Sequence, residues 1–186
     1  MSRADPASPA NAAHGGAGYL DVEISRAGGG WDPAAEEIVL RAAQAAFAVE
    51  DPDAVAEVSV LLADDAFVQT LNRKYRGKDR PTNVLSFPQA AGPAEAHFGE
   101  PRTLGDVVLA YETVKEEARD QGKTFDAHLA HLVVHGMLHL MGYDHQDEQE
   151  AADMEELERT VLARFGIADP YADAGAESER DPEEKQ

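Results

Sequence analysis

The stretch His135-Gly-Met-Leu-His139-Leu-Met-Gly142-Tyr-Asp-His145 holds three of the seven histidines of the chain. His135 and His139 are four residues apart, so on a helix they lie on one face, one turn from each other. Gly142 stands where a helix commonly ends, because glycine adopts the left-handed cap conformation at little cost. A turn there can bring His145 back toward the first two histidines. Three converging imidazoles predict a metal site with an open fourth position, the arrangement of catalytic zinc.

This spacing is that of the metzincin proteases, H-E-x-x-H-x-x-G-x-x-H. In those enzymes the glutamate after the first histidine is the general base. Here that position is Gly136, so the sequence predicts the metal scaffold without the usual base. The alternative is a set of ordinary helix and loop histidines, and the three histidines together with the glycine favour the metal.

Length and composition limit the class of protein. The chain has 186 residues, no cysteine and a net charge of −20. This length fits one domain with a core of its own, and without cysteine there are no disulfides or thiolate zinc ligands. No stretch approaches the ~20 apolar residues of a membrane span, and the first residues lack the apolar run of a secretory signal. We therefore expect a cytoplasmic protein that does not contact membranes.

The acidic excess argues against a nucleic-acid partner, but the basic residues are concentrated in one segment. These are Arg73, Lys74, Arg76, Lys78 and Arg80, hereafter the basic segment. Cations in the last turn of a helix are favoured by the helix dipole, which explains Arg73 and Lys74 without any function. It explains Lys78 and Arg80 less well, because they follow the helix. A phosphate-bearing substrate could therefore be bound locally.

Hydrophobic periodicity predicts four strands and five helices. The predicted strands cover residues 19–25, 56–63, 82–88 and 105–110, and the predicted helices cover residues 33–49, 65–76, 111–121, 124–141 and 147–165. We expect an α+β fold with a mixed four-stranded sheet covered by helices, and the metal site on a central helix and the following turn. A single domain is expected over residues 19–166, with disordered segments at residues 1–18 and 167–186.

Four further residues are candidates for the surroundings of the metal. Asp144 adjoins His145 and could orient an imidazole through its ring N–H or cap the turn, and both interpretations stay open. His131 is too far along the helix to be a fourth ligand, so a hydrogen-bonded core histidine is favoured. Ser86 and Tyr143 are pocket candidates by position alone.

Three blocks of the sequence resemble the bacterial YbeY family of endoribonucleases. They are the histidine stretch, the segment Leu71-Asn-Arg-Lys-Tyr-Arg76-Gly-Lys-Asp-Arg-Pro-Thr-Asn-Val-Leu-Ser-Phe-Pro88, and Leu104-Gly-Asp-Val-Val. The resemblance covers roughly residues 55 to 166 and leaves both ends of the chain outside.

The resemblance implies one zinc ion held by His135, His139 and His145 in a single-strand-specific endoribonuclease. The implied substrate is ribosomal RNA on the small ribosomal subunit, with a role in 16S rRNA 3′-end maturation and in ribosome quality control. The functional arginine of the family falls on Arg76.

The chemistry of phosphodiester hydrolysis is compatible with these assignments. Three neutral imidazoles leave the metal charge uncancelled, which lowers the pKa of a coordinated water from about 15.7 toward ~7. Arg76 can stabilise the negative charge that grows on the phosphate with two parallel hydrogen bonds, and Lys78 and Arg80 can hold flanking phosphates.

Two other functions remain open. One is a metal-dependent peptidase whose base comes from elsewhere in the fold, against which Gly136 and the basic segment speak. The other is a non-catalytic, zinc-containing ribosome assembly factor, against which the open coordination position speaks. Three histidines also suit nickel, copper or iron, and the sequence does not indicate an oligomeric state.

Overall fold

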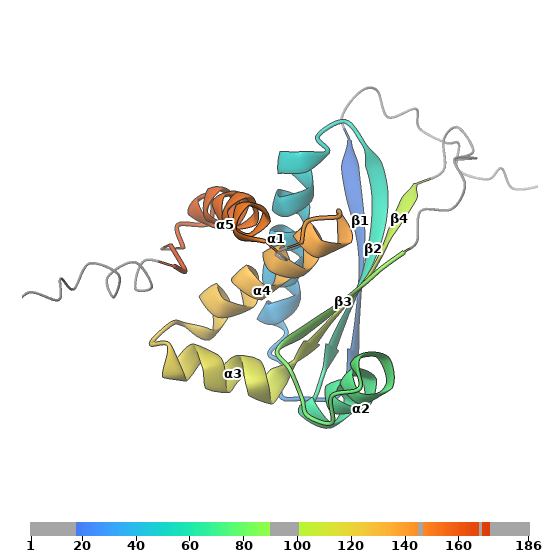
Figure 1. Cartoon of the computed structure of the whole chain (residues 1–186), viewed down its shortest axis with the longest axis vertical. Coiled ribbons are helices and arrows are strands. Elements are labelled where there is room, and N and C mark those ends of the chain that lie inside the picture. The colour runs from blue at the N-terminus through green and yellow to red at the C-terminus, as the bar shows by residue number, and fades with distance from the viewer. Residues whose placement is uncertain (1–17, 90–100, 145–146, 168, 172–186) are drawn as a thin grey trace, which may run out of the picture.

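A computed structural model describes residues 18–89, 101–144, 147–167 and 169–171. Within them a four-stranded sheet packs with five helices (Figure 1). The strands are β1 (Tyr19–Ala27), β2 (Val55–Ala63), β3 (Val84–Pro88) and β4 (Arg102–Ala110). The helices are α1 (Ala34–Glu50), α2 (Asp65–Arg76), α3 (Tyr111–Asp120), α4 (Phe125–Leu140) and α5 (Glu148–Ala163). The predicted α+β class is confirmed, whereas the predictions for residues 1–17, 172–186 and His145 lie outside the described residues.

The sheet is mixed and has the order β1-β2-β4-β3. The pairs β1–β2 and β2–β4 are parallel, and β3 runs antiparallel to β4 at one edge. The register of β4 against β2 shifts between Glu57 and Ser59. Gly105 lies beside this shift with a φ of 128°, and a Cβ atom there would be 2.2 Å from the Phe87 carbonyl oxygen. This irregularity interrupts the side-chain alternation, which is why the sequence pattern placed the start of β4 at residue 105 instead of Arg102.

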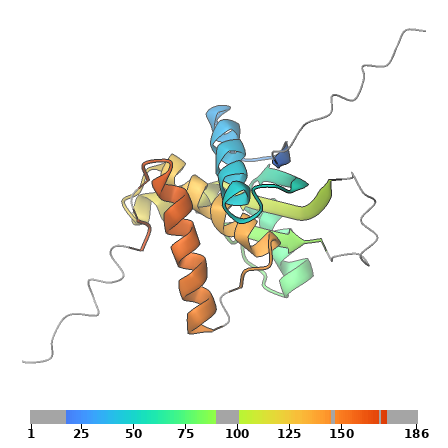
Figure 2. The same cartoon turned by 90° about the horizontal axis from the view of Figure 1, so that it is seen from above.

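Helices cover the two faces of the sheet unequally (Figures 1 and 2). α1 and α4 pack on one face, and α5 packs against both of them. α2 packs on the opposite face, where Val68 belongs to a second buried cluster with Leu85 and Val108. None of the helices in the described ranges is long and apolar enough to cross a membrane.

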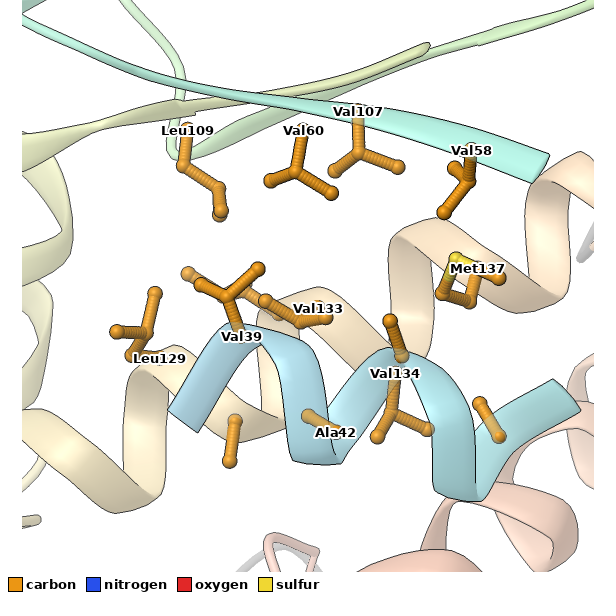
Figure 3. Packing of buried hydrophobic residues seen from close by; sticks show 14 of the residues in the cluster. Val39, Ala42, Val58, Val60, Val107, Leu109, Leu129, Val133, Val134 and Met137 are labelled. Carbon is orange, nitrogen blue, oxygen red and sulfur yellow. The ribbon is translucent and has the colours of Figure 1, made fainter. Parts of the chain in front are cut away.

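The main core lies between the sheet, α1 and α4 (Figure 3). Its strand residues are Val58, Val60, Val107 and Leu109, and its helix residues include Val39, Ala42, Leu129, Val133, Val134 and Met137. These side chains are 0–2% exposed, so α1 and α4 are fixed against the sheet by apolar packing on most of their length.

Local sequence sets both ends of α4. The Thr124 hydroxyl accepts a hydrogen bond from the Ala127 N–H at 3.2 Å, which caps the N-terminus. At the other end Gly142 has a φ of 101°, its N–H donates to the His139 carbonyl at 3.2 Å, and the Tyr143 N–H donates to the Leu138 carbonyl at 3.0 Å. This is the Schellman pairing of a left-handed cap. The predicted glycine stop is confirmed, and it turns the chain directly after the second histidine.

Candidate functional site

His135 and His139 meet at the C-terminal half of α4. Their Nε2 atoms lie 3.1 Å apart, and the two rings are nearly perpendicular, with centroids 4.6 Å apart. The predicted one-turn spacing therefore brings the two imidazoles together on one face of the helix.

The opposite nitrogen of each ring is held by an acceptor. His135 Nδ1 lies 2.8 Å from Glu158 Oε1, and His139 Nδ1 lies 2.9 Å from the Tyr143 carbonyl oxygen. Because a carboxylate and a carbonyl accept but do not donate, both Nδ1 atoms carry the proton. The Nε2 atoms of the two rings then face each other.

Two electron-pair donors at this separation fit a metal ion between them. Nitrogens each about 2.0–2.1 Å from a tetrahedral zinc ion lie roughly 3.3 Å apart. A hydrogen-bonded Nδ1–H behind each ligand is also the usual arrangement around protein-bound zinc. The donor set of His135 and His139 thus fits two ligands of a zinc ion.

Glu158 of α5 is the buried anion of the site. Its side chain is fully buried, and its second oxygen, Oε2, accepts from His131 Nε2 at 3.0 Å and from the Tyr171 hydroxyl. Burial raises the pKa of this carboxyl, but the hydrogen bonds from His131, His135 and Tyr171 outweigh burial and hold the pKa at about 2. Glu158 is therefore an ionised carboxylate that accepts hydrogen bonds from three donors.

A cleft of about 520 Å³ opens over the two histidines. Its lining includes polar side chains from α2, from β3 and the segment before it, and from the turn after α4: Arg76, Thr82, Asn83, Ser86, Tyr143 and Asp144. The structure thus brings Arg76, at the end of α2, to the same cleft as His135 and His139. Ser86 and Tyr143, the pocket candidates by position, also line it, and so does Asp144.

Gly136 faces the sheet and not the cleft. Its carbonyl accepts a hydrogen bond from the Ser86 hydroxyl at 3.3 Å, and the space where a side chain would begin is filled by Val107 and Ser86. A glutamate at this position would therefore meet β3 and β4 here.

Tyr143 links the turn after α4 to the end of α1. Its hydroxyl donates to Glu50, while its carbonyl holds His139. The hydrogen bond to Glu50, followed by burial, raises the pKa of Tyr143 to about 12. This contact fixes the carbonyl that orients the second histidine.

Two of the three predicted ligands, His135 and His139, lie in the described part of the chain. His145 lies outside the described residues, and within them no group of three His, Cys, Asp or Glu side chains forms a metal site. His131 is hydrogen-bonded to Glu158, which confirms the prediction of a hydrogen-bonded histidine. Glu158 was not predicted, although its position among the apolar residues Met154 and Val161 of α5 is a signal in the sequence: a carboxylate on a buried helix face needs partners.

Comparison with known proteins gives one consistent result. The family model described as Endoribonuclease YbeY matches residues 30–166. A Rhodopseudomonas palustris (strain BisB18) protein named Endoribonuclease YbeY is 57% identical over 140 residues, which cover 75% of this chain and 83% of that protein. A Paramagnetospirillum magneticum protein of the same name is 59% identical over 133 residues, which cover 71% and 81%. The solution structure of TM1509 from Thermotoga maritima has a TM-score of 0.54 and 25% identity, and the match covers 88% of this chain and 99% of that one.

Proposed function

Because this chain belongs to the endoribonuclease YbeY family, a nuclease family of 16S rRNA 3′-end maturation, we propose that it cleaves single-stranded ribosomal RNA at a zinc ion held by His135, His139 and His145. The observation that carries this proposal is the pair of Nε2 atoms that face each other at 3.1 Å in the cleft. We also propose that the protein acts on the small ribosomal subunit in the cytoplasm and takes part in ribosome quality control.

The groups that hold the rings of His135 and His139 support these two residues as ligands. His135 and His139 each carry a proton on Nδ1, since Glu158 and the Tyr143 carbonyl accept it, which leaves Nε2 of each ring for the metal. His145 follows Asp144, which lines the cleft, and supplies the third imidazole. When bound, zinc supplies positive charge that acidifies water and polarises a phosphoryl oxygen.

Arg76 binds the scissile phosphate. It is the last residue of α2 and lines the cleft together with His135 and His139. Its planar guanidinium can donate two parallel hydrogen bonds to phosphate oxygens, and these strengthen as negative charge accumulates there. Lys78 and Arg80 follow α2 directly and hold the flanking phosphates, so that the substrate meets positive charge locally although the chain carries −20 overall.

The walls of the cleft give a reason for single-stranded specificity. The cleft has polar walls from Thr82 and Asn83 on one side and the turn after α4 on the other. A single strand can bend its backbone into such a cleft, whereas a stiff duplex cannot bring one phosphodiester to its floor.

A peptidase is the weaker alternative. Its general base in the related metal motif would extend from residue 136, and that position is glycine packed against Val107 and Ser86. A peptide substrate also has no need of the cations of the basic segment.

Metal analysis combined with two substrates separates these functions. Protein purified without chelator is expected to contain one zinc per chain and to cleave single-stranded RNA, but not duplex RNA or casein. Chelation should abolish cleavage, and added zinc should restore it. Cleavage of casein with intact RNA would identify a peptidase instead.

The enzymatic proposal and the alternative of a non-catalytic assembly factor predict different results for one variant. His139→Ala is expected to fold, to bind small subunits and to lose RNA cleavage. If wild-type protein bound subunits but cleaved no RNA under any metal condition, the enzymatic proposal would be rejected and the assembly role retained.

A further inference from the structure

One buried carboxylate joins three separate parts of the chain behind the metal ligands. Glu158 Oε1 is 2.8 Å from His135 Nδ1, and Glu158 Oε2 is 3.0 Å from His131 Nε2. The Tyr171 hydroxyl donates to the same Oε2. The Glu158 side chain is 1% exposed, so protein groups and not bulk water provide its hydrogen bonds.

We propose that Glu158 is the positioning residue that fixes the tautomer and orientation of His135 for metal binding, and that Tyr171 holds Glu158 in place from the C-terminal end of the described chain. This inference rests on the proposed function, because it assigns His135 as a ligand. It adds two residues that do not touch the metal or the substrate.

A carboxylate is the group that this position requires. Three donors converge on its two oxygens: the His135 and His131 ring N–H groups and the Tyr171 hydroxyl. His131 Nδ1 is buried and has no hydrogen-bond partner in the described part of the chain, so the proton that this ring donates to Glu158 is on Nε2. An amide in place of Glu158 would turn one acceptor into a donor and leave at least one N–H or O–H group without a partner.

The effect on the ligand is electrostatic as well as geometric. The carboxylate stabilises the proton on His135 Nδ1 and so keeps the electron pair on Nε2, the atom that faces His139. Negative charge behind an imidazole also increases its basicity as a ligand. The Nδ1–H of His139 is bound by a backbone carbonyl instead. Of these two ligands, only His135 has a metal affinity that a side-chain substitution behind the ring can change.

Tyr171 reaches Glu158 because the chain after α5 folds back over the site. The Pro170 carbonyl accepts from Lys123 Nζ at 3.2 Å, the Tyr171 N–H donates to Asp169 Oδ1 at 2.9 Å, and the Arg159 guanidinium lies over the Tyr171 ring at 5.0 Å. Tyr171 follows residue 166, where the family match ends. Tyr171 thus adds a hydrogen bond to the site from beyond α5.

Three variants test the proposal. Glu158→Gln keeps the shape of the side chain and removes its charge. Tyr171→Phe keeps the ring over Arg159 and His131 but removes the hydroxyl. Glu156→Gln is the matched control, since Glu156 lies on the exposed face of the same helix and undergoes the same chemical change.

Zinc affinity is measured by competition with a chromogenic chelator, and the His135 tautomer is read from long-range ¹H–¹⁵N NMR spectra of the metal-free protein. Glu158→Gln is expected to weaken zinc binding by about 10- to 100-fold and to lose the single Nδ1–H tautomer of His135. Tyr171→Phe should weaken zinc binding by a smaller factor with the same tautomer, and Glu156→Gln should match wild type.

The outcomes separate this inference from the proposed function. Wild-type zinc affinity and an Nδ1–H tautomer in Glu158→Gln would overturn the inference while leaving the metal site intact. If Glu158→Gln lowered the thermal stability without any change in zinc affinity, Glu158 would have only a structural role, and the inference would also be overturned. If Glu158→Gln does not fold, Tyr171→Phe decides, and unchanged zinc affinity there rejects the role of Tyr171. Wild-type protein that binds no zinc would instead reject the proposed function.

Discussion

Gly136 and Val107 are in direct contact where α4 crosses the sheet, because a Cβ atom on Gly136 would stand only 3.0 Å from Val107 Cγ1. Ser86 Oγ would lie 3.2 Å from the same Cβ. The missing side chain after the first histidine is therefore a packing requirement of α4, and it also removes the base that a protease with this spacing uses. One position thus contributes to both the fold and the chemistry.

Substitutions at Gly136 should lower stability without creating a peptidase. Alanine gains about 1 kcal/mol of helix propensity, but crowding against Val107 and Ser86 costs about 1–3 kcal/mol, so Gly136→Ala is expected to be destabilised by about 1 kcal/mol. Gly136→Glu should lose more than about 3 kcal/mol, because it forces a carboxylate against an apolar strand. Urea unfolding and a casein assay measure these effects. Wild-type stability of Gly136→Glu would show that α4 can move away from the sheet.

Metal removal should destabilise the protein by mass action. Free zinc at 100 times its dissociation constant adds about 2.7 kcal/mol to the free energy of unfolding, so chelation should lower the thermal midpoint. His145→Ala should lose the zinc-dependent part of the stability and keep that of the metal-free protein. His97→Ala, a histidine outside the motif, is the control. Full zinc stabilisation of His145→Ala would exclude residue 145 as a ligand.

The hydrogen bond from Tyr143 to Glu50 should shift the titration of Tyr143 to higher pH. The pKa of Tyr143 is raised to about 12 from an ordinary value near 10. A raised pKa means that the stabilisation is fully present below about pH 10 and is lost as the pH rises through about 12. Subtracting the ultraviolet phenolate titration of Tyr143→Phe from that of wild type should isolate a step near pH 12, and Glu50→Gln should move it toward 10. Tyr19→Phe, a substitution of an exposed tyrosine of β1, is the control and should leave the step near pH 12 in place. A step near 10 for Tyr143 in wild-type protein would contradict the contact.

Much of the fold was predictable because its signals are local. Thr124, Asp64 and Asp147 accept backbone hydrogen bonds at the starts of α4, α2 and α5, and Gly142 ends α4 as its position suggested. Such caps need only a few neighbouring residues. The start of β4 was wrong by three residues, because a register shift beside Gly105 depends on the partner strand β2.

The site was predictable where its residues share one helix turn and less so elsewhere. His135 and His139 are four residues apart, and their meeting follows from helix geometry. The contact of His135 with Glu158 spans 23 residues, and that of His131 with Tyr171 spans 40. No periodicity links such pairs, since only the packing of α5 on α4 and the return of the C-terminal segment bring them together. Arg76 lines the cleft for the same reason: α2 and α4 approach it from different parts of the sheet.

Arg76 should contribute to the transition state more than to general attraction of RNA. Arg76→Ala is expected to lower kcat/KM for single-stranded RNA roughly 10²-fold, as for the loss of one donor to a developing oxyanion. Arg76→Lys should recover only part of this, because an ammonium group lacks the paired donors of a guanidinium. Arg73→Ala is the matched control: Arg73 is in the same last turn of α2 but faces Asp79 at 3.9 Å, and its removal should leave kcat near that of wild type. Full cleavage by Arg76→Lys at both low and high salt would exclude bidentate binding of the phosphate. If low salt restored the cleavage that Arg76→Ala loses, Arg76 would contribute only general electrostatic attraction of RNA, like the other cations of the basic segment.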